Sequence, residues 1–130
     1  MFLADASFIV SPFAKRPARR KWAQTFFERN RGRLWTTEAA FTEASYLIGE
    51  PLVTARILAD YQFLLDLDAE KGALAALLEK YSPEMDFADA TLVRASELRP
   101  AFKVVTGDRH FDGYRRNRGR ERIPVVWIPA

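Results

Sequence analysis

Short apolar segments alternate with longer amphipathic ones along this chain, and the alternation restricts its possible folds more than any other feature. The apolar segments are predicted strands: residues 2–4, 34–36, 102–106 and 125–128. The amphipathic segments repeat apolar residues at helical spacing and are predicted helices: residues 16–29, 38–48, 52–61, 69–80 and 87–98. Residues 63–65 fit either a short strand or a helix end. The pattern indicates an α/β fold, a three-layer α/β/α sandwich with a mainly parallel central sheet, and 130 residues suit one domain spanning 1–130.

The chain contains no cysteine and a single histidine, His110, which excludes several kinds of site. Without cysteine there is no disulfide, thiolate nucleophile or zinc–sulfur centre, and one histidine cannot form a multi-histidine metal site. No basic residue precedes the first apolar run, and no apolar run approaches the roughly 18 residues of a membrane span. We therefore expect a cytoplasmic protein without a signal peptide or membrane segment.

The net charge of +3 conceals a basic–acidic–basic distribution. Residues 1–33 carry eight basic and two acidic side chains, residues 34–89 carry three and eleven, and residues 90–130 carry nine and four. Much of the basic charge is arginine, whose planar guanidinium suits contact with phosphates. We select four of these side chains as candidate nucleic-acid contacts: Arg19, Arg20, Arg116 and Arg118. Each arginine cluster also fits the solvated face of a surface helix.

Four acidic residues stand where a ligand site of an α/β sheet is expected. Asp5 and Asp108 follow predicted strands, and ligands bind beyond the carboxyl ends of such strands. Glu43 and Asp89 lie on predicted helices among small and apolar residues, so we expect each to project from a largely apolar face. A buried carboxylate needs a partner, and no lysine or arginine lies within four residues of Glu43. Converging carboxylates favour Mg²⁺ or Mn²⁺, which can activate water for attack on a phosphodiester.

The segments that carry these acids resemble PIN-domain ribonucleases, and most closely the VapC-like toxins of bacterial and archaeal toxin–antitoxin pairs. In chain order the segments are LADASFIV, TTEAAFTEASYLI, MDFADATLVRASEL and VVTGDRHF. Each alone is a weak match, but four in this order over a chain of this size are a strong one. The resemblance implies a PIN-like fold and a Mg²⁺- or Mn²⁺-dependent endoribonuclease that cleaves single-stranded RNA. It also implies a homodimer that is neutralised by a small cognate antitoxin protein.

The resemblance assigns roles to individual residues of this sequence. The catalytic and metal-binding acids that it implies are Asp5, Glu43, Asp89 and Asp108, with Asp86 as a further metal ligand. Ser7 and Thr106 match polar residues of the same segments. We expect these two hydroxyls to orient the carboxylates, although they also fit plain capping positions.

Several alternatives stay open. Glu38 stands at a predicted helix start, where it suits the helix dipole better than the site. Asp86 fits an N-cap as well as a ligand, and His110 fits a surface position better than a general base. A catalytically silent nucleic-acid or protein binding module on the same fold is the main functional alternative, and DNA is an alternative substrate. A phospho-receiver module is disfavoured because Ala6, not a second acid, follows Asp5 and no late Lys-Pro pair occurs.

Overall fold

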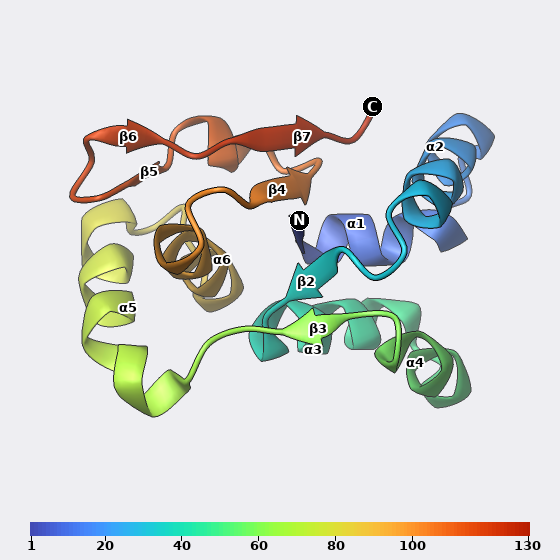
Figure 1. Cartoon of the computed structure of the whole chain (residues 1–130), viewed down its shortest axis with the longest axis horizontal. Helices are drawn as coiled ribbons and strands as arrows, with labels where there is room; N and C mark the ends of the chain where they lie inside the picture. Colours follow the sequence, from blue (N-terminus) through green and yellow to red (C-terminus); the bar gives the residue numbers. More distant parts are fainter.

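A five-stranded parallel sheet forms the centre of the computed structural model, which describes residues 1–130 (Figure 1). Its strands are β1 (Phe2–Ala4), β2 (Leu34–Thr36), β3 (Gln62–Phe63), β4 (Lys103–Thr106) and β7 (Val125–Trp127). They are ordered β3-β2-β1-β4-β7, and every neighbouring pair is parallel. The central strand β1 pairs Leu3 with Trp35 on one side and with Val104 on the other. The predicted mainly parallel sheet is confirmed.

Helices cover both faces of this sheet and complete a three-layer α/β/α arrangement. The α-helices are α1 (Ala6–Val10), α2 (Pro17–Arg29), α3 (Glu38–Ile48), α4 (Pro51–Leu58), α5 (Leu67–Tyr81) and α6 (Phe87–Leu98). Two short 3₁₀ helices, η1 (Ser11–Phe13) and η2 (Arg109–Asp112), and an antiparallel hairpin of β5 (Arg115–Arg116) and β6 (Glu121–Arg122) complete the chain. Figure 1 shows α5 and α6 on one side of the sheet and α1 and α2 on the other. None of these helices is both long enough and apolar enough to cross a membrane.

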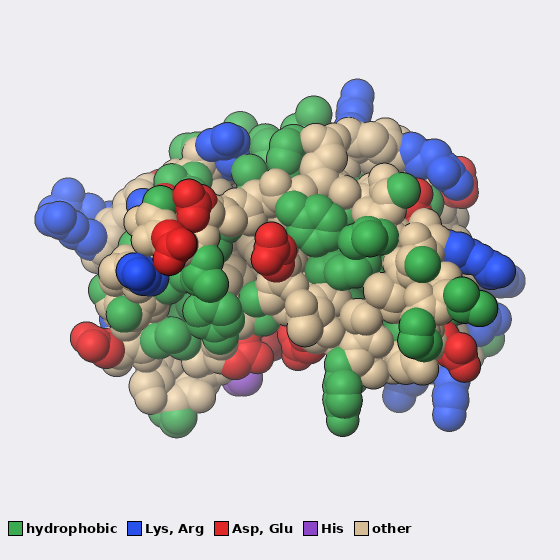
Figure 2. All heavy atoms as spheres, turned by 90° about the horizontal axis from the view of Figure 1, so that it is seen from below, with side chains coloured by type: hydrophobic (Ala, Val, Ile, Leu, Met, Phe, Trp, Pro, Cys, Tyr) green, Lys and Arg blue, Asp and Glu red, His purple; other side chains and the backbone are tan.

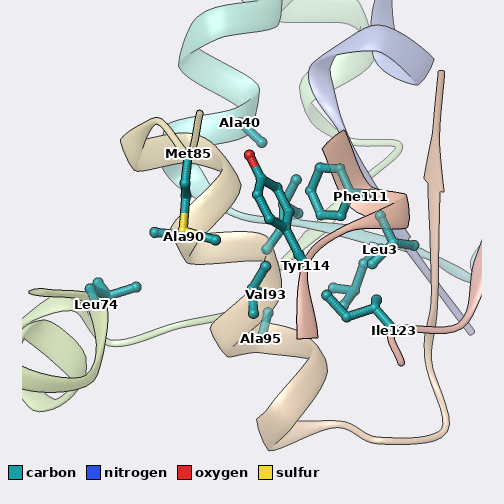
Figure 3. Close-up of a cluster of buried hydrophobic side chains, with 12 residues drawn as sticks. Leu3, Ala40, Leu74, Met85, Ala90, Val93, Ala95, Phe111, Tyr114 and Ile123 are labelled. Atoms are coloured by element: carbon teal, nitrogen blue, oxygen red, sulfur yellow. The ribbon is translucent and has the colours of Figure 1, made fainter. Parts of the chain in front are cut away.

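Alternating strand residues divide the core between the two faces, as the period of a strand requires. Leu3 and Val104 belong to a cluster with α5 and α6, whereas Ala4 and Val105 belong to a cluster with α1 and α2. In the first cluster the Tyr114 ring packs edge-on against that of Phe111, as Figure 3 shows, with centroids 5.1 Å apart. Tyr114, which follows η2, is therefore part of the core.

The structure also differs from the sequence-based prediction in several elements. A short helix, α1, begins directly after Asp5, where no helix is predicted. The helix predicted to start at residue 69 begins at Leu67, because the Asp66 side chain accepts hydrogen bonds from the next backbone N–H groups. The ambiguous segment near residue 63 forms the edge strand β3. The β5–β6 hairpin is missed as well, since its two-residue strands are arginine-rich and lack apolar alternation.

Candidate active site

Two acidic side chains stand at the carboxyl edge of adjacent strands. Asp5 follows β1 directly, and Asp108 follows β4 after one intervening glycine. Because β1 and β4 pair in parallel, their carboxyl ends lie side by side. The predicted location of these two acids is confirmed.

Asp5 is buried, and three donors hold its carboxylate. Oδ1 accepts the Ala6 backbone N–H at 2.7 Å, and Oδ2 accepts the hydroxyls of Ser7 at 3.0 Å and Thr106 at 2.6 Å. Ser7 Oγ also accepts the backbone N–H of Gly107 at 3.1 Å. Burial raises the pKa of Asp5, whereas these hydrogen bonds act in the opposite direction and the Asp108 charge adds to the rise. The expectation that Ser7 and Thr106 orient a carboxylate therefore has a structural basis.

Replacing Thr106 with Val tests this arrangement, because valine keeps the shape but removes the hydroxyl that Asp5 and the Asp108 N–H both use. We expect the free energy of unfolding to fall by about 1–3 kcal/mol near neutral pH, since an ionised buried carboxylate loses a donor. The loss is expected to shrink in acid, where Asp5 is protonated. Urea unfolding of the metal-free protein at both pH values measures it.

Thr36→Val is the matched control, because Thr36 is equally buried at the end of β2, on the other side of β1, and donates to the neutral Ala4 carbonyl at 2.8 Å. Its loss of stability is expected to be the same at both pH values. A Thr106→Val effect that is likewise independent of pH would show that this hydroxyl does not serve the Asp5 carboxylate.

Asp89 is the second buried acid of the site. It lies in the first turn of α6, is 5% exposed, and accepts the Tyr114 hydroxyl at 2.9 Å on Oδ2. Burial and the neighbouring Asp86 charge raise the pKa of Asp89 to about 7, with smaller contributions from Asp5 and Asp108, and the Tyr114 hydrogen bond opposes them. No lysine or arginine forms an ion pair with Asp89 or Asp5. Two carboxylates are thus buried here without a cationic partner.

Asp86 serves as the N-cap of α6. Its Oδ1 accepts the Asp89 backbone N–H at 2.8 Å, and its side chain is exposed. Of the two roles left open by the sequence, the structure shows the cap. The capping contact also fixes the first turn of α6, and hence the position of Asp89.

Glu43 differs from the sequence-based expectation, because it is exposed and does not project from a buried face. The buried face of α3 is formed by Ala40, Phe41 and Ala44, and the apolar neighbour Tyr46 points into solvent with 85% exposure. The pKa of Glu43 is still raised, by partial desolvation and then by the charges of the other site acids. Glu43 therefore belongs electrostatically to the same group. Glu38 lies outside it, in the first turn of α3.

We define the acid cluster as Asp5, Glu43, Asp86, Asp89 and Asp108. The charge of Asp108 raises the pKa values of Asp5, Glu43 and Asp89, and the charges of Asp5 and Asp86 raise those of Glu43 and Asp89. No three acidic or histidine side chains lie close enough together to ligate a single ion directly. Mg²⁺ commonly keeps several waters and uses only one or two carboxylates. The two buried, unpaired carboxylates of Asp5 and Asp89 fit a hydrated divalent cation of this kind.

The four candidate nucleic-acid arginines are in different environments. Arg19 Nε donates to Ser11 Oγ at 3.2 Å, and its guanidinium lies against Gly107, where an added Cβ would be only 2.9 Å from Nη2. It is therefore next to the loop between Thr106 and Asp108. Arg20 Nη1 donates to the Ala14 carbonyl at 2.9 Å. Arg118 is exposed on the β5–β6 turn.

Arg116 does not suit the role predicted for it, because it is buried rather than presented to solvent. Only 4% of it is exposed, and its guanidinium donates to the Ser96 carbonyl at 2.9 Å and to Glu121 Oε1 at 2.7 Å. An arginine cluster in the sequence gives no information on which member faces inward. Arg116 attaches the hairpin to α6 and is not available to phosphates.

Sequence reasoning missed Tyr114, which contacts Asp89 from 25 positions along the chain. No local pattern marks it, because only the path of the chain through η2 brings the ring back over α6. His110 is exposed and lies beside the cluster, with Nδ1 3.2 Å from Asp108 Oδ1. Figure 2 shows the histidine next to acidic side chains at one edge of the molecule. Its surface position agrees with the sequence-based expectation.

The parallel five-stranded sheet, the flanking helices and acids at the carboxyl edge define a PIN-like α/β fold. A chain in the crystal structure of FitAcB from Neisseria gonorrhoeae is similar to this one, with a TM-score of 0.56 over 84% of this chain and 88% of that chain. The sequences are 13% identical, so the likeness is one of fold. No family model matches the sequence, and no curated protein does.

Proposed function

We propose that this protein is a metal-dependent endoribonuclease that cleaves single-stranded RNA and is the toxin of a toxin–antitoxin pair. The observation that carries the proposal is the burial of Asp5 and Asp89 without any cationic partner, at the carboxyl edge of a PIN-like sheet. Buried unpaired carboxylates destabilise a fold, so their retention at a ligand-binding edge favours a functional role. The sequence resemblance to PIN-domain ribonucleases and the similar fold support the same conclusion.

The chain's own groups suit work on a phosphodiester. Mg²⁺ or Mn²⁺, when bound, would activate water and offset the charge of the phosphate. Asp5 and Asp89 would hold the ion, with Glu43 and Asp108 nearby to bind its waters. Hydroxyls fix Asp5 and Tyr114 fixes Asp89, so both carboxylates are oriented before substrate arrives. Arg19 lies against Gly107, and we expect its guanidinium to contact a phosphate beside the cluster.

A protein partner is part of the same proposal. Exposed apolar side chains gather on α3 and α4, where Tyr46 is 85%, Leu47 59% and Leu52 73% exposed. Figure 2 shows hydrophobic side chains distributed over this face. Exposed apolar area of this kind is typical of interaction surfaces, and we assign it to a second copy of the chain or to a small antitoxin.

Metal dependence gives the direct test. Single-stranded RNA is expected to be cleaved in Mg²⁺ or Mn²⁺, and excess EDTA is expected to abolish cleavage because the acids alone do not activate water. Cleavage products of a labelled RNA are resolved on a gel, with single-stranded DNA and duplex RNA of the same sequence as controls. Binding of RNA without cleavage under every metal condition would favour the alternative, a catalytically silent binding module on this fold.

A further inference from the structure

A second polar site lies between α5, α6 and the β5–β6 hairpin, at a distance from the acid cluster. It is a cavity of about 490 Å³ whose lining includes four basic side chains and one acidic one: Lys80, Arg94, Arg115, Arg118 and Glu97. We call it the basic pocket. Figure 2 shows basic side chains projecting at the left edge, the side on which the β5–β6 turn lies in Figure 1.

The charges of the basic pocket are only partly neutralised. Arg94 is paired, with Nε 2.6 Å from Glu70 and Nη1 3.2 Å from Glu97. No ion pair involves Lys80, Arg115 or Arg118. The one acid of the lining is further occupied, because Glu97 Oε2 accepts the Asn117 backbone N–H at 2.6 Å. Three cations therefore line the cavity without a carboxylate partner, of which Arg115 is engaged by the backbone carbonyls of Asp112 and Tyr114.

The hairpin that carries two of these residues is held in an uncommon conformation. Three successive turn residues have positive φ: Asn117 at 55°, Arg118 at 62° and Gly119 at 85°. This region is unfavourable for a non-glycine residue, because Cβ comes too close to the following carbonyl oxygen. Contacts to α6 maintain it, through the Asn117–Glu97 hydrogen bond and the buried guanidinium of Arg116. The turn is thus fixed on α6 and not left mobile.

Gly119 brings Lys80 to the same turn. A Cβ at this position would lie only 2.5 Å from Lys80 Nζ, so the absence of a side chain lets the ammonium lie against the turn. The stem of Lys80 also places Nζ 5.5 Å from the Tyr81 ring centroid. Helix α5 and the β5–β6 hairpin therefore present Lys80 and Arg118 at the same turn, which no local sequence pattern predicts.

The basic pocket and the acid cluster are joined by rigid elements. Asp89 lies in the first turn of α6 and Glu97 in its last, so eight residues of helix separate them by about 12 Å. The hairpin itself begins after Tyr114, whose hydroxyl contacts Asp89. A single-stranded nucleic acid that enters the acid cluster carries one negative charge per nucleotide. It therefore needs further cationic contacts within about this distance of the cluster.

We propose that the basic pocket binds backbone phosphates of the single-stranded RNA whose cleavage is proposed for the acid cluster. This inference rests on that proposed function and names a second contact region for the same substrate. The guanidinium of Arg118 and the ammonium of Lys80 contact phosphates, and Arg116 holds the turn that carries Arg118. The contact is independent of base sequence, because it uses the backbone alone.

The test measures binding without cleavage. A labelled single-stranded RNA of about 12 nucleotides is titrated in EDTA at several salt concentrations, with the Lys80→Gln/Arg118→Asn double variant beside the unaltered protein. Asparagine is chosen because it tolerates the left-handed conformation of residue 118. We expect the dissociation constant of the double variant to rise about tenfold at low salt. The slope of a plot of log Kd against log salt concentration is expected to fall by about 1.4, because two contacts are removed and each single-strand phosphate contact contributes about 0.7.

The Lys71→Gln/Lys103→Gln variant removes the same charge from exposed positions outside the pocket and is expected to bind as the unaltered protein does. If the salt slopes of the two double variants are equal, the proposal that the basic pocket binds RNA is overturned. Metal-dependent cleavage by the same protein would still support the proposed function. Polyglutamate is titrated against the same variants as a model of an acidic protein. If the Lys80→Gln/Arg118→Asn variant loses polyglutamate binding but keeps RNA binding, the inference is overturned in favour of an acidic protein partner. A reduced slope in a protein that never cleaves RNA would support the pocket and contradict only the nuclease proposal.

Discussion

Asp89→Asn is expected to lower metal-dependent RNA cleavage by about 100-fold or more while the protein stays folded. Asparagine keeps the size of Asp89 and an oxygen that can accept the Tyr114 hydroxyl, so the packing around this buried position is retained. It removes the negative charge that would hold a divalent cation. Removal of a single electrostatic contact in an active site typically costs about 100- to 1,000-fold in rate. Initial rates on a labelled single-stranded RNA in Mn²⁺ measure the effect.

Asp112→Asn provides the matched control, because Asp112 is an exposed acid of η2, four positions beyond Asp108 along the chain. Its rate is expected to equal that of the unaltered protein. Circular dichroism establishes that both variants are folded. Undiminished cleavage by a folded Asp89→Asn protein would remove Asp89 from the proposed site, and with it the main support for the nuclease assignment.

The stability of the metal-free protein is expected to fall as the pH rises through neutrality. The pKa of Asp89 is raised to about 7 in the folded state, whereas an aspartate in the unfolded chain titrates near 3.9. Between these values the folded state binds more protons than the unfolded state, so the free energy of unfolding decreases with increasing pH. The raised pKa values of Asp5 and Glu43 act in the same direction. A loss on the order of a few kcal/mol from about pH 5 to about pH 8 follows from Asp89 alone.

Urea unfolding in EDTA across this pH range measures the loss, and Asp89→Asn identifies its source. The variant has no carboxyl to ionise at this position, so its stability is expected to change less with pH and to exceed that of the unaltered protein at about pH 8. Addition of Mn²⁺ is expected to restore stability to the unaltered protein and to do so more weakly in the variant. A flat pH dependence in the unaltered protein would contradict the burial of an unpaired carboxylate.

The loss of cleavage and the gain in stability expected for Asp89→Asn have the same cause, the buried charge of Asp89. The same charge that destabilises the metal-free fold is the one that would hold the cation. The Asp89→Asn protein would therefore be more stable at about pH 8 and far less active, the exchange of stability for function that strained or charged active sites commonly show. A purely structural role for Asp89 predicts instead that its replacement lowers stability.

Much of the acid cluster follows from local patterns in the sequence. An apolar run precedes both Asp5 and Asp108 and predicts that each follows a strand, and parallel strands of one sheet bring such ends to a shared edge. The small and apolar helical neighbours of Asp89 predict that it is buried, and it is. The same pattern gives a wrong prediction for Glu43, because apolar residues near it, such as Tyr46 and Leu47, face solvent rather than the core. Local composition does not distinguish a core face from an exposed interaction face.

By itself, the sequence determined the order of the longer helices and of four of the five sheet strands, the parallel α/β class and the candidate acids, because these depend on periodicity and on neighbours along the chain. Only the tertiary structure decided that Tyr114 holds Asp89, that Arg116 is buried while Arg118 is exposed, and that Lys80 joins the hairpin. Each of these contacts joins segments far apart in sequence. Their formation depends on how the chain crosses the sheet and packs its helices, which no local pattern of residues specifies.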